Sequence, residues 1–207
     1  MHDGTHAATM DAHWGGGVSP FGATWQKTMM WIFIVTDALL FSGLLCGYAY
    51  LRMAGQLTWP ATGKVFSLPF IALMTFILIT SSMTMGTAVT AARLGDRKKA
   101  FVNLVFTIVG GAAFLGCQAF EWTHLIREGA RLGSNPWGAP QFGACFFVLT
   151  GFHGSHVFSG LVILVVTAIR TSLGKTPAQG VEMAGLYWHF VDLVWVFIFT
   201  LFYLLPN

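Results

Sequence analysis

Five long apolar runs, separated by short polar breaks, constrain the fold of this chain more than any other feature. A bilayer core about 30 Å thick requires roughly 20 apolar residues for each helical crossing. The runs reach that length and cover residues 29–50, 68–92, 101–120, 142–169 and 183–205. They are too long and too evenly apolar for the alternating strands of a membrane barrel. The sequence therefore predicts an all-α integral membrane bundle of five transmembrane helices.

The composition agrees with a membrane protein. Only 9% of the 207 residues are charged, whereas 55% are hydrophobic. Because so few charges could not coat a soluble domain of this size, most of the surface must face lipid. Residues 1–24 are polar and rich in Gly and His, without an apolar period, which predicts a flexible polar tail. Residues 25–207 then form one membrane domain.

Basic residues are distributed unequally between the two ends of the predicted helices. On the side of the N-terminus lie Lys27, Arg93, Arg97, Lys98, Lys99, Arg170 and Lys175. On the opposite side lie Arg52, Lys64, Arg127 and Arg131. Since short loops rich in Lys and Arg stay in the cytoplasm, this bias predicts the N-terminus inside and the C-terminus outside.

The sequence argues against several classes of function. The formal net charge of +3 is spread over the helix ends and forms no stripe that could follow a nucleic-acid backbone. Cys46, Cys117 and Cys145 each lie within an apolar run and form no C-x-x-C pair, which argues against a thiolate metal site. No nucleophile with an adjacent base and no phosphate-binding loop is recognisable. We therefore expect no nucleic-acid partner and no catalytic residue on this chain.

Six polar groups lie inside the predicted membrane helices. A charged side chain in hydrocarbon costs at least about 2.5 kcal/mol, so each group must find a partner, water or a neutral form. The six are Asp37, Glu121, His153, His156, His189 and Asp192. His153 and His156 are separated by three residues, as are His189 and Asp192, so each pair shares a face of its helix.

Three interpretations of these six groups are compatible with their spacing. Histidines at i, i+3 that face carboxylates could bind a metal in the core of a bundle. Glu121 lies near the outer end of its helix, however, well away from the depth of His189 and Asp192, so we expect no metal site. A structural network of His–carboxylate hydrogen bonds and a proton-exchanging network both stay open.

Two long motifs are more specific than composition. Residues 186–195 read LYWHFVDLVW, and residues 146–157 read FFVLTGFHGSHV. They resemble the W-H-F-x-D-x-x-W and T-G-x-H-G-x-H segments of subunit III of the haem-copper terminal oxidases. Other matching segments occur in family order, namely Trp31 to Phe41, Ser81-Ser82, Gly95 to Lys98 and Gln118 to Glu121. The resemblance covers about residues 25–207 and points to the cytochrome c oxidase subunit 3 family, in its short five-helix bacterial type.

The resemblance implies an accessory subunit of a proton-pumping complex that reduces O2 to water in aerobic respiration. Haem and copper belong to partner subunits in that family, so no cofactor is expected on this chain, and whether it counts as an enzyme by itself stays open. The implied partners are the catalytic subunit I, subunit II and membrane phospholipids, with membership of a larger respiratory supercomplex left open. The implied location is the bacterial inner membrane. Cytochrome c is the preferred electron donor and a quinol is the alternative.

Two residues receive roles through the resemblance. Asp37 would face the boundary with subunit I as a protonatable group near proton uptake, and its alternative is a protonated carboxylic acid that only fixes helix packing. The mitochondrial type has Glu at this position and two further helices before Trp25. Arg170 matches a position that can meet a lipid phosphate, and ordinary snorkelling is its alternative.

A protein of a different class is also compatible with these residues. A stand-alone transporter or proton channel would line a path with Asp37, His156, His189 and Asp192. It would require these groups to face one water-filled cavity within the chain.

Overall fold

The described part of the chain consists of helices and short connections. The computed structural model describes residues 24–54, 59–60, 65–134 and 136–204. Its elements are α2 (Trp25–Ala54), α4 (Leu68–Arg93), α5 (Arg97–Arg127), α6 (Pro140–Ser172) and α7 (Ala178–Ile198), which continues as the π-helical segment η1 (Phe199–Leu204). Within these ranges there are five helices long and apolar enough to cross a membrane, and no β-strand. The predicted all-α bundle of five transmembrane helices is confirmed.

Some of the predictions concern residues that the structure does not describe. The predicted tail, residues 1–24, falls outside the described residues except for its last residue, and so does residue 205 at the end of the fifth predicted run. The predicted orientation of the termini stays a prediction.

Local sequence explains where the helices begin and end. The side chain of Asp96 caps α5 by accepting a hydrogen bond from the backbone N–H of Lys99 at 3.0 Å. Gly95 precedes it with a φ of 79°, which closes the turn after α4 and favours glycine. Helix α5 extends beyond the predicted run 101–120 at both ends, because polar residues continue the helix outside the apolar segment.

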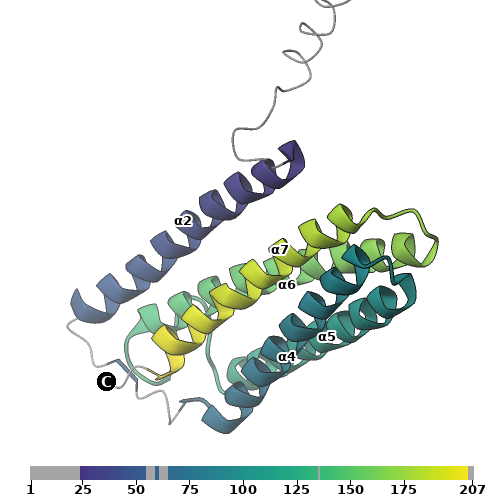
Figure 1. Ribbon diagram of the computed structural model, residues 1–207. Coiled ribbons are helices and arrows are strands. Elements are labelled where there is room, and N and C mark those ends of the chain that lie inside the picture. The colour runs from purple at the N-terminus through teal and green to yellow at the C-terminus, as the bar shows by residue number, and fades with distance from the viewer. Residues whose placement is uncertain (1–23, 55–58, 61–64, 135, 205–207) are drawn as a thin grey trace, which may run out of the picture.

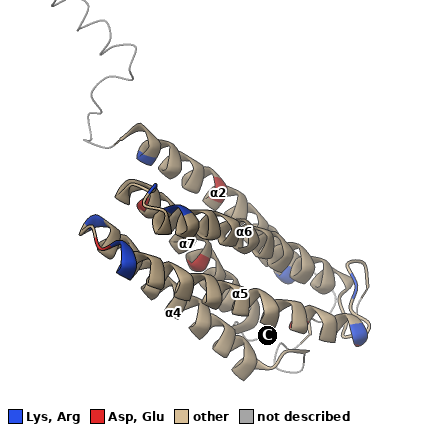
Figure 2. Ribbon diagram, turned by 90° about the vertical axis from the view of Figure 1, so that its right-hand side faces the viewer, with Lys and Arg blue, Asp and Glu red and all other residues tan. Residues whose placement is uncertain are grey.

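Four helices form a bundle and the fifth lies beside it. Helices α4, α5, α6 and α7 pack side by side, whereas α2 runs along α7 and α6, away from α4 and α5 (Figure 1). Lys and Arg gather near the two ends of the helices and leave the middle almost free of basic charge (Figure 2). This distribution is the one expected for helices whose middle parts lie in lipid.

The core of the bundle is aromatic and tightly packed. Its largest fully buried side chains include Trp188, Trp195, Tyr203, Phe114 and Phe146. The Trp188 ring lies between two glycines: a Cβ at Gly160 would stand 3.1 Å from the ring, and a Cβ at Gly111 would overlap it. Small residues therefore let α5 and α6 approach α7 closely, as is typical of membrane helix packing.

Candidate functional site

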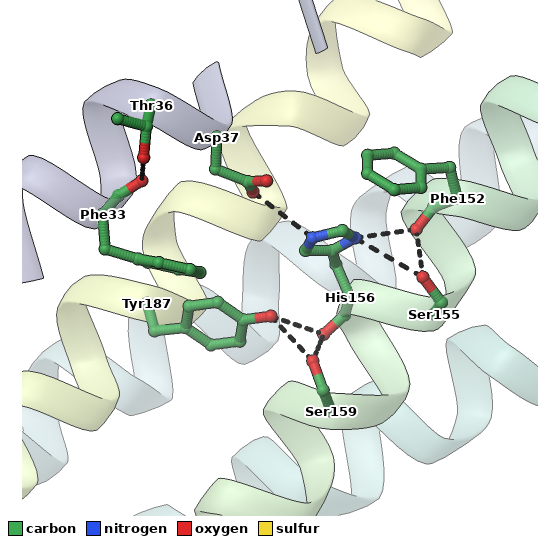
Figure 3. Close-up of polar contacts among 8 residues, drawn as sticks. All are labelled: Phe33, Thr36, Asp37, Phe152, Ser155, His156, Ser159 and Tyr187. Carbon is green, nitrogen blue, oxygen red and sulfur yellow. Dashed lines mark hydrogen bonds and ion pairs between the residues drawn. The ribbon is translucent and has the colours of Figure 1, made fainter. Parts of the chain in front are cut away.

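An aspartate and a histidine meet in the membrane between α2 and α6. The Oδ2 atom of Asp37 lies 3.4 Å from Nε2 of His156, and the two side chains are 10% and 16% exposed (Figure 3). Asp37 shares the buried stripe of α2 with Ile34, Phe41 and Tyr48, spaced by three, four and seven residues. That helical spacing turns the carboxylate toward the bundle.

The backbone of α6 fixes the orientation of the His156 ring. Its Nδ1 atom lies 2.8 Å from the carbonyl oxygen of Phe152, one turn earlier. Because a carbonyl can only accept, Nδ1 must carry a proton and donate it. The Phe41 and Phe152 rings pack against the imidazole, with centroids 5.2 and 4.6 Å away.

This orientation decides what the pair can do chemically. With its proton on Nδ1, a neutral imidazole presents a bare Nε2 lone pair to Asp37. A favourable contact then requires one more proton, held either by Asp37 as a carboxylic acid or by His156 as an imidazolium. Asp37 Oδ2 has no hydrogen-bond partner among the described residues, so Nε2 of His156 at 3.4 Å is the polar group that faces it.

Two hydroxyl groups extend the polar cluster toward α7. Ser159 donates to the carbonyl oxygen of His156 at 2.9 Å, and the Tyr187 hydroxyl lies 2.7 Å from Ser159 Oγ. Both side chains also line a groove of about 720 Å³ between α2, α6 and α7, which reaches Trp25 and Gln26 near the first turn of α2. Ser159 and Tyr187 therefore connect the Asp37–His156 pair to the wall of an otherwise largely apolar groove.

Other predicted polar residues belong to separate groups. The Nδ1 atom of His189 forms a hydrogen bond with Ser82 Oγ on α4, at 2.6 Å. His153 is 1% exposed, and neither ring nitrogen has a hydrogen-bond partner among the described residues. It instead stacks on Trp195 at 5.3 Å and meets the edge of Phe114. Asp192 is buried near the middle of α7 and accepts a hydrogen bond from Ser82, the residue that also contacts His189, whereas its Oδ1 has no hydrogen-bond partner in the described part of the chain.

Glu121 lies toward the opposite end of the bundle. It accepts long hydrogen bonds from Gln118 Nε2 at 3.4 Å and from the Tyr203 hydroxyl at 3.5 Å. His124 follows at i+3, a spacing known from bundle metal sites. Within the described residues, however, no three His, Cys, Asp or Glu side chains come together as a metal site.

A charged cluster that the sequence analysis missed holds α2 at its first turn. Glu182 on α7 pairs with Lys27 Nζ on α2 at 2.6 Å and with Arg93 on α4 at 3.0 Å. In the sequence, Lys27 and Arg93 served only as indicators of topology. The available signal was Glu182 itself, an acidic residue just before the last apolar run and at the end where basic residues gather. Arg170 lies exposed in the last turn of α6, at this same end.

Comparison with known proteins identifies the family. The profile described as "Cytochrome c oxidase subunit III" matches residues 8–206. The chain belongs to the cytochrome c oxidase subunit III family. The resemblance inferred from residues 146–157 and 186–195 is thereby confirmed.

Several curated relatives of this subunit III share about a third of its residues. It is 36% identical to "Cytochrome bo(3) ubiquinol oxidase subunit 3" of Pseudomonas aeruginosa, over 99% of this chain and 90% of the relative. It is 38% identical to "Quinol oxidase subunit 3" of Bacillus subtilis, over 84% of each chain. It is 32% identical to "Probable quinol oxidase subunit 3" of Staphylococcus saprophyticus, over 87% of this chain and 89% of the relative.

Family membership also defines the kind of assembly. As a subunit III of the haem-copper oxidases, the chain is a multi-pass membrane protein that works with the catalytic subunits of an oxidase complex of the respiratory chain.

Proposed function

We propose that this subunit III is the accessory subunit of a proton-pumping quinol oxidase in a bacterial inner membrane. The observation that carries the choice of donor is the agreement of the three relatives named above, which cover most of the chain and are all quinol or ubiquinol oxidase subunits. They favour a quinol over cytochrome c, the donor that the motifs alone led us to prefer. Subunits I and II are the proposed partners.

The surroundings of the three membrane-embedded histidines support an accessory role. A redox core needs several histidines aimed at haem or copper. Here His153 packs among aromatic rings, His189 bonds Ser82, and His156 bonds the backbone of its own helix. Haem and copper are therefore assigned to the partner subunits, and no redox centre to this chain.

The Asp37–His156 pair is the proposed functional element of the chain. It can hold one proton in two ways, and its aspartate lies on α2, the described helix with the least contact to the others. We assign α2 to the boundary with subunit I, with the Asp37 carboxylate on the side of the helix that faces α6. There a group that exchanges a proton would serve the proton-uptake side of the oxidase. Glu121, His189 and Asp192 are given structural roles.

Phospholipid binding is the second part of the proposed role. The groove between α2, α6 and α7 has apolar walls that include Met29, Phe33 and Ile163. Such a surface suits an acyl chain, and Arg170 at the same end of the bundle could meet a lipid phosphate. A lipid there would fill the space between α2 and the bundle.

Purification of the tagged chain in a mild detergent tests this function. We expect haem bands in the visible spectrum, a large catalytic subunit in the mass spectrum, and faster oxidation of a quinol than of reduced cytochrome c. Fast oxidation of cytochrome c, together with a retained cytochrome c domain, would overturn the choice of donor. A colourless, solitary protein would overturn the accessory role.

The rival function, a stand-alone transporter or channel, has less support. Asp37 and His156 face each other between α2 and α6, whereas His189 bonds Ser82 between α4 and α7. A single path would have to join these groups across the packed core, where Trp188 and Trp195 are fully buried.

A further inference from the structure

A second groove lies at the other end of the bundle, where α5 ends and α6 begins. It has a volume of about 590 Å³, within the range of about 300–1,000 Å³ that is usual for small-molecule sites. Its walls come from α5, from α6 and from the connection between them, and they are Trp122, Ile126, Ala130, Arg131, Leu132, Gly133 and Phe147. We refer to it as the α5–α6 groove.

Arg131 is held firmly at this groove. Its backbone N–H donates to the carbonyl oxygen of Ser134 at 2.7 Å, so the connection folds back on itself. Its own carbonyl oxygen would stand 2.5 Å from a Cβ placed at Gly143, which shows how closely the connection packs on α6. The backbone of Arg131 is thus fixed in position, and its side chain extends from it beside an apolar wall.

The positive charge at the groove has no acidic partner among the described residues. No ion pair of Arg131 occurs among the described residues, and the nearby acidic residue Glu128 lies 3.6 Å from His124 instead. The indole N–H of Trp122 is also occupied, since it donates to Thr150 Oγ1 at 3.1 Å. Arg131 is therefore the charged group that lines the groove and remains available to a ligand.

We propose that the α5–α6 groove binds an anionic phospholipid, with an acyl chain against the apolar wall and the phosphate at Arg131. The groove lies at a membrane-facing helix end, where an acyl chain and a phosphate reach the protein together. An arginine fork is suited to a phosphate, because it can donate two hydrogen bonds to it. The lipid comes from the leaflet opposite the N-terminus, so this site is separate from the groove beside Asp37. The proposal rests on the membrane placement of the chain and not on the identity of the electron donor.

Native mass spectrometry of the full-length chain in its purified complex tests this site. After detergent exchange removes bound lipid, the complex is titrated in parallel with phosphatidylglycerol and with zwitterionic phosphatidylcholine. Arg131→Gln removes the charge from the groove, and Arg127→Gln removes an exposed charge at the same end that does not line it. We expect Arg131→Gln to weaken the tightest phosphatidylglycerol binding about tenfold, whereas Arg127→Gln leaves it unchanged.

A second pair of variants tests the apolar wall. Ile126→Trp fills the groove from α5, and Val109→Trp places the same side chain on an exposed position of α5 outside it. We expect Ile126→Trp to reduce binding of both lipids and Val109→Trp to reduce neither. Equal effects of the two arginine variants, or equal affinity of the wild type for both lipids, would overturn the proposal. A photo-crosslinker at Leu132 that captures a partner subunit in place of lipid would overturn it as well.

Discussion

Helix α2 and the bundle of α4 to α7 are held in place by different means. The bundle buries large aromatic side chains at glycine contacts such as Gly111 against Trp188. Helix α2 buries only four residues, among them Phe41 against Phe152, and it is also attached by polar contacts at three depths. These are Lys27 to Glu182, Asp37 to His156, and the Tyr48 hydroxyl, which donates to the carbonyl oxygen of Leu201 at 3.1 Å.

This difference in attachment indicates different roles for the bundle and for α2. Lipid gives no hydrophobic driving force between helices, so close packing and polar contacts must hold them together. A bundle fixed by close packing has one arrangement, because its shape complementarity is distributed over many atoms. A helix with few buried side chains, whose attachment includes separate polar contacts, can respond to a partner or to a change in protonation. We therefore regard the bundle as the scaffold and α2 as the responsive part.

The largest effect is expected from a substitution that disturbs close packing in the bundle. Gly111→Val would force a side chain into the Trp188 ring and should lower the free energy of unfolding by about 3 kcal/mol. Gly116→Val is the matched control on the same helix, because a Cβ at Gly116 meets nothing within 4 Å. Unfolding in mixed detergent micelles measures both. Equal losses would show that the Trp188 contact does not hold the bundle.

Substitution of the two histidines of α6 compares a contact with α2 and a contact within the bundle directly. His156→Leu leaves the buried Asp37 without its partner and should lower the free energy of unfolding by about 2 kcal/mol. His153→Leu removes two ring nitrogens that have no hydrogen-bond partner among the described residues, so its change should stay within about 1 kcal/mol of zero. The same unfolding assay ranks the two variants. A larger loss for His153→Leu would mean that a polar contact of this ring holds the core.

A smaller effect is expected where the first turn of α2 is attached. Glu182→Gln removes the shared partner of Lys27 and Arg93 and should lower the free energy of unfolding by about 1 kcal/mol. The N-terminal part of α2 should also become more mobile, which spin labels on α2 and α7 would record. Glu128→Gln, which affects the more exposed pair with His124, is the control. Unchanged spin-label distances in Glu182→Gln would refute the role of this cluster.

The helices could be predicted from sequence because apolar length is a local property. The runs 68–92 and 142–169 lie within α4 and α6. The i, i+3 spacing predicted a shared helix face for His153 and His156. The same spacing could not tell His153 from His156. At about 100° per residue, positions three apart differ in direction by about 60°. That rotation sends His153 into the aromatic core and His156 toward α2.

Contacts between helices that are distant in the chain could not be predicted from the sequence. Asp37 and His156 are far apart along the chain, and nothing in their local patterns says which helices will be neighbours. Glu182 was missed for the same reason, since its partners Lys27 and Arg93 come from two other helices. The sequence of α2 also contains the spacing Gly43-x-x-x-Gly47. It is typical of close helix packing, yet a Cβ at either glycine would meet none of the described residues within 4 Å.

The turnover lifetime of the oxidase carrying Asp37→Asn tests the division between scaffold and responsive helix most directly. Asp192→Asn, a buried carboxylate of the bundle, is the matched control. We predict that both variants assemble with normal haem content, and that only Asp37→Asn oxidises its donor more slowly or inactivates sooner during turnover. If Asp37→Asn shows the rate, proton-uptake kinetics and lifetime of the wild type, the Asp37–His156 pair only fixes helix packing and the account is contradicted.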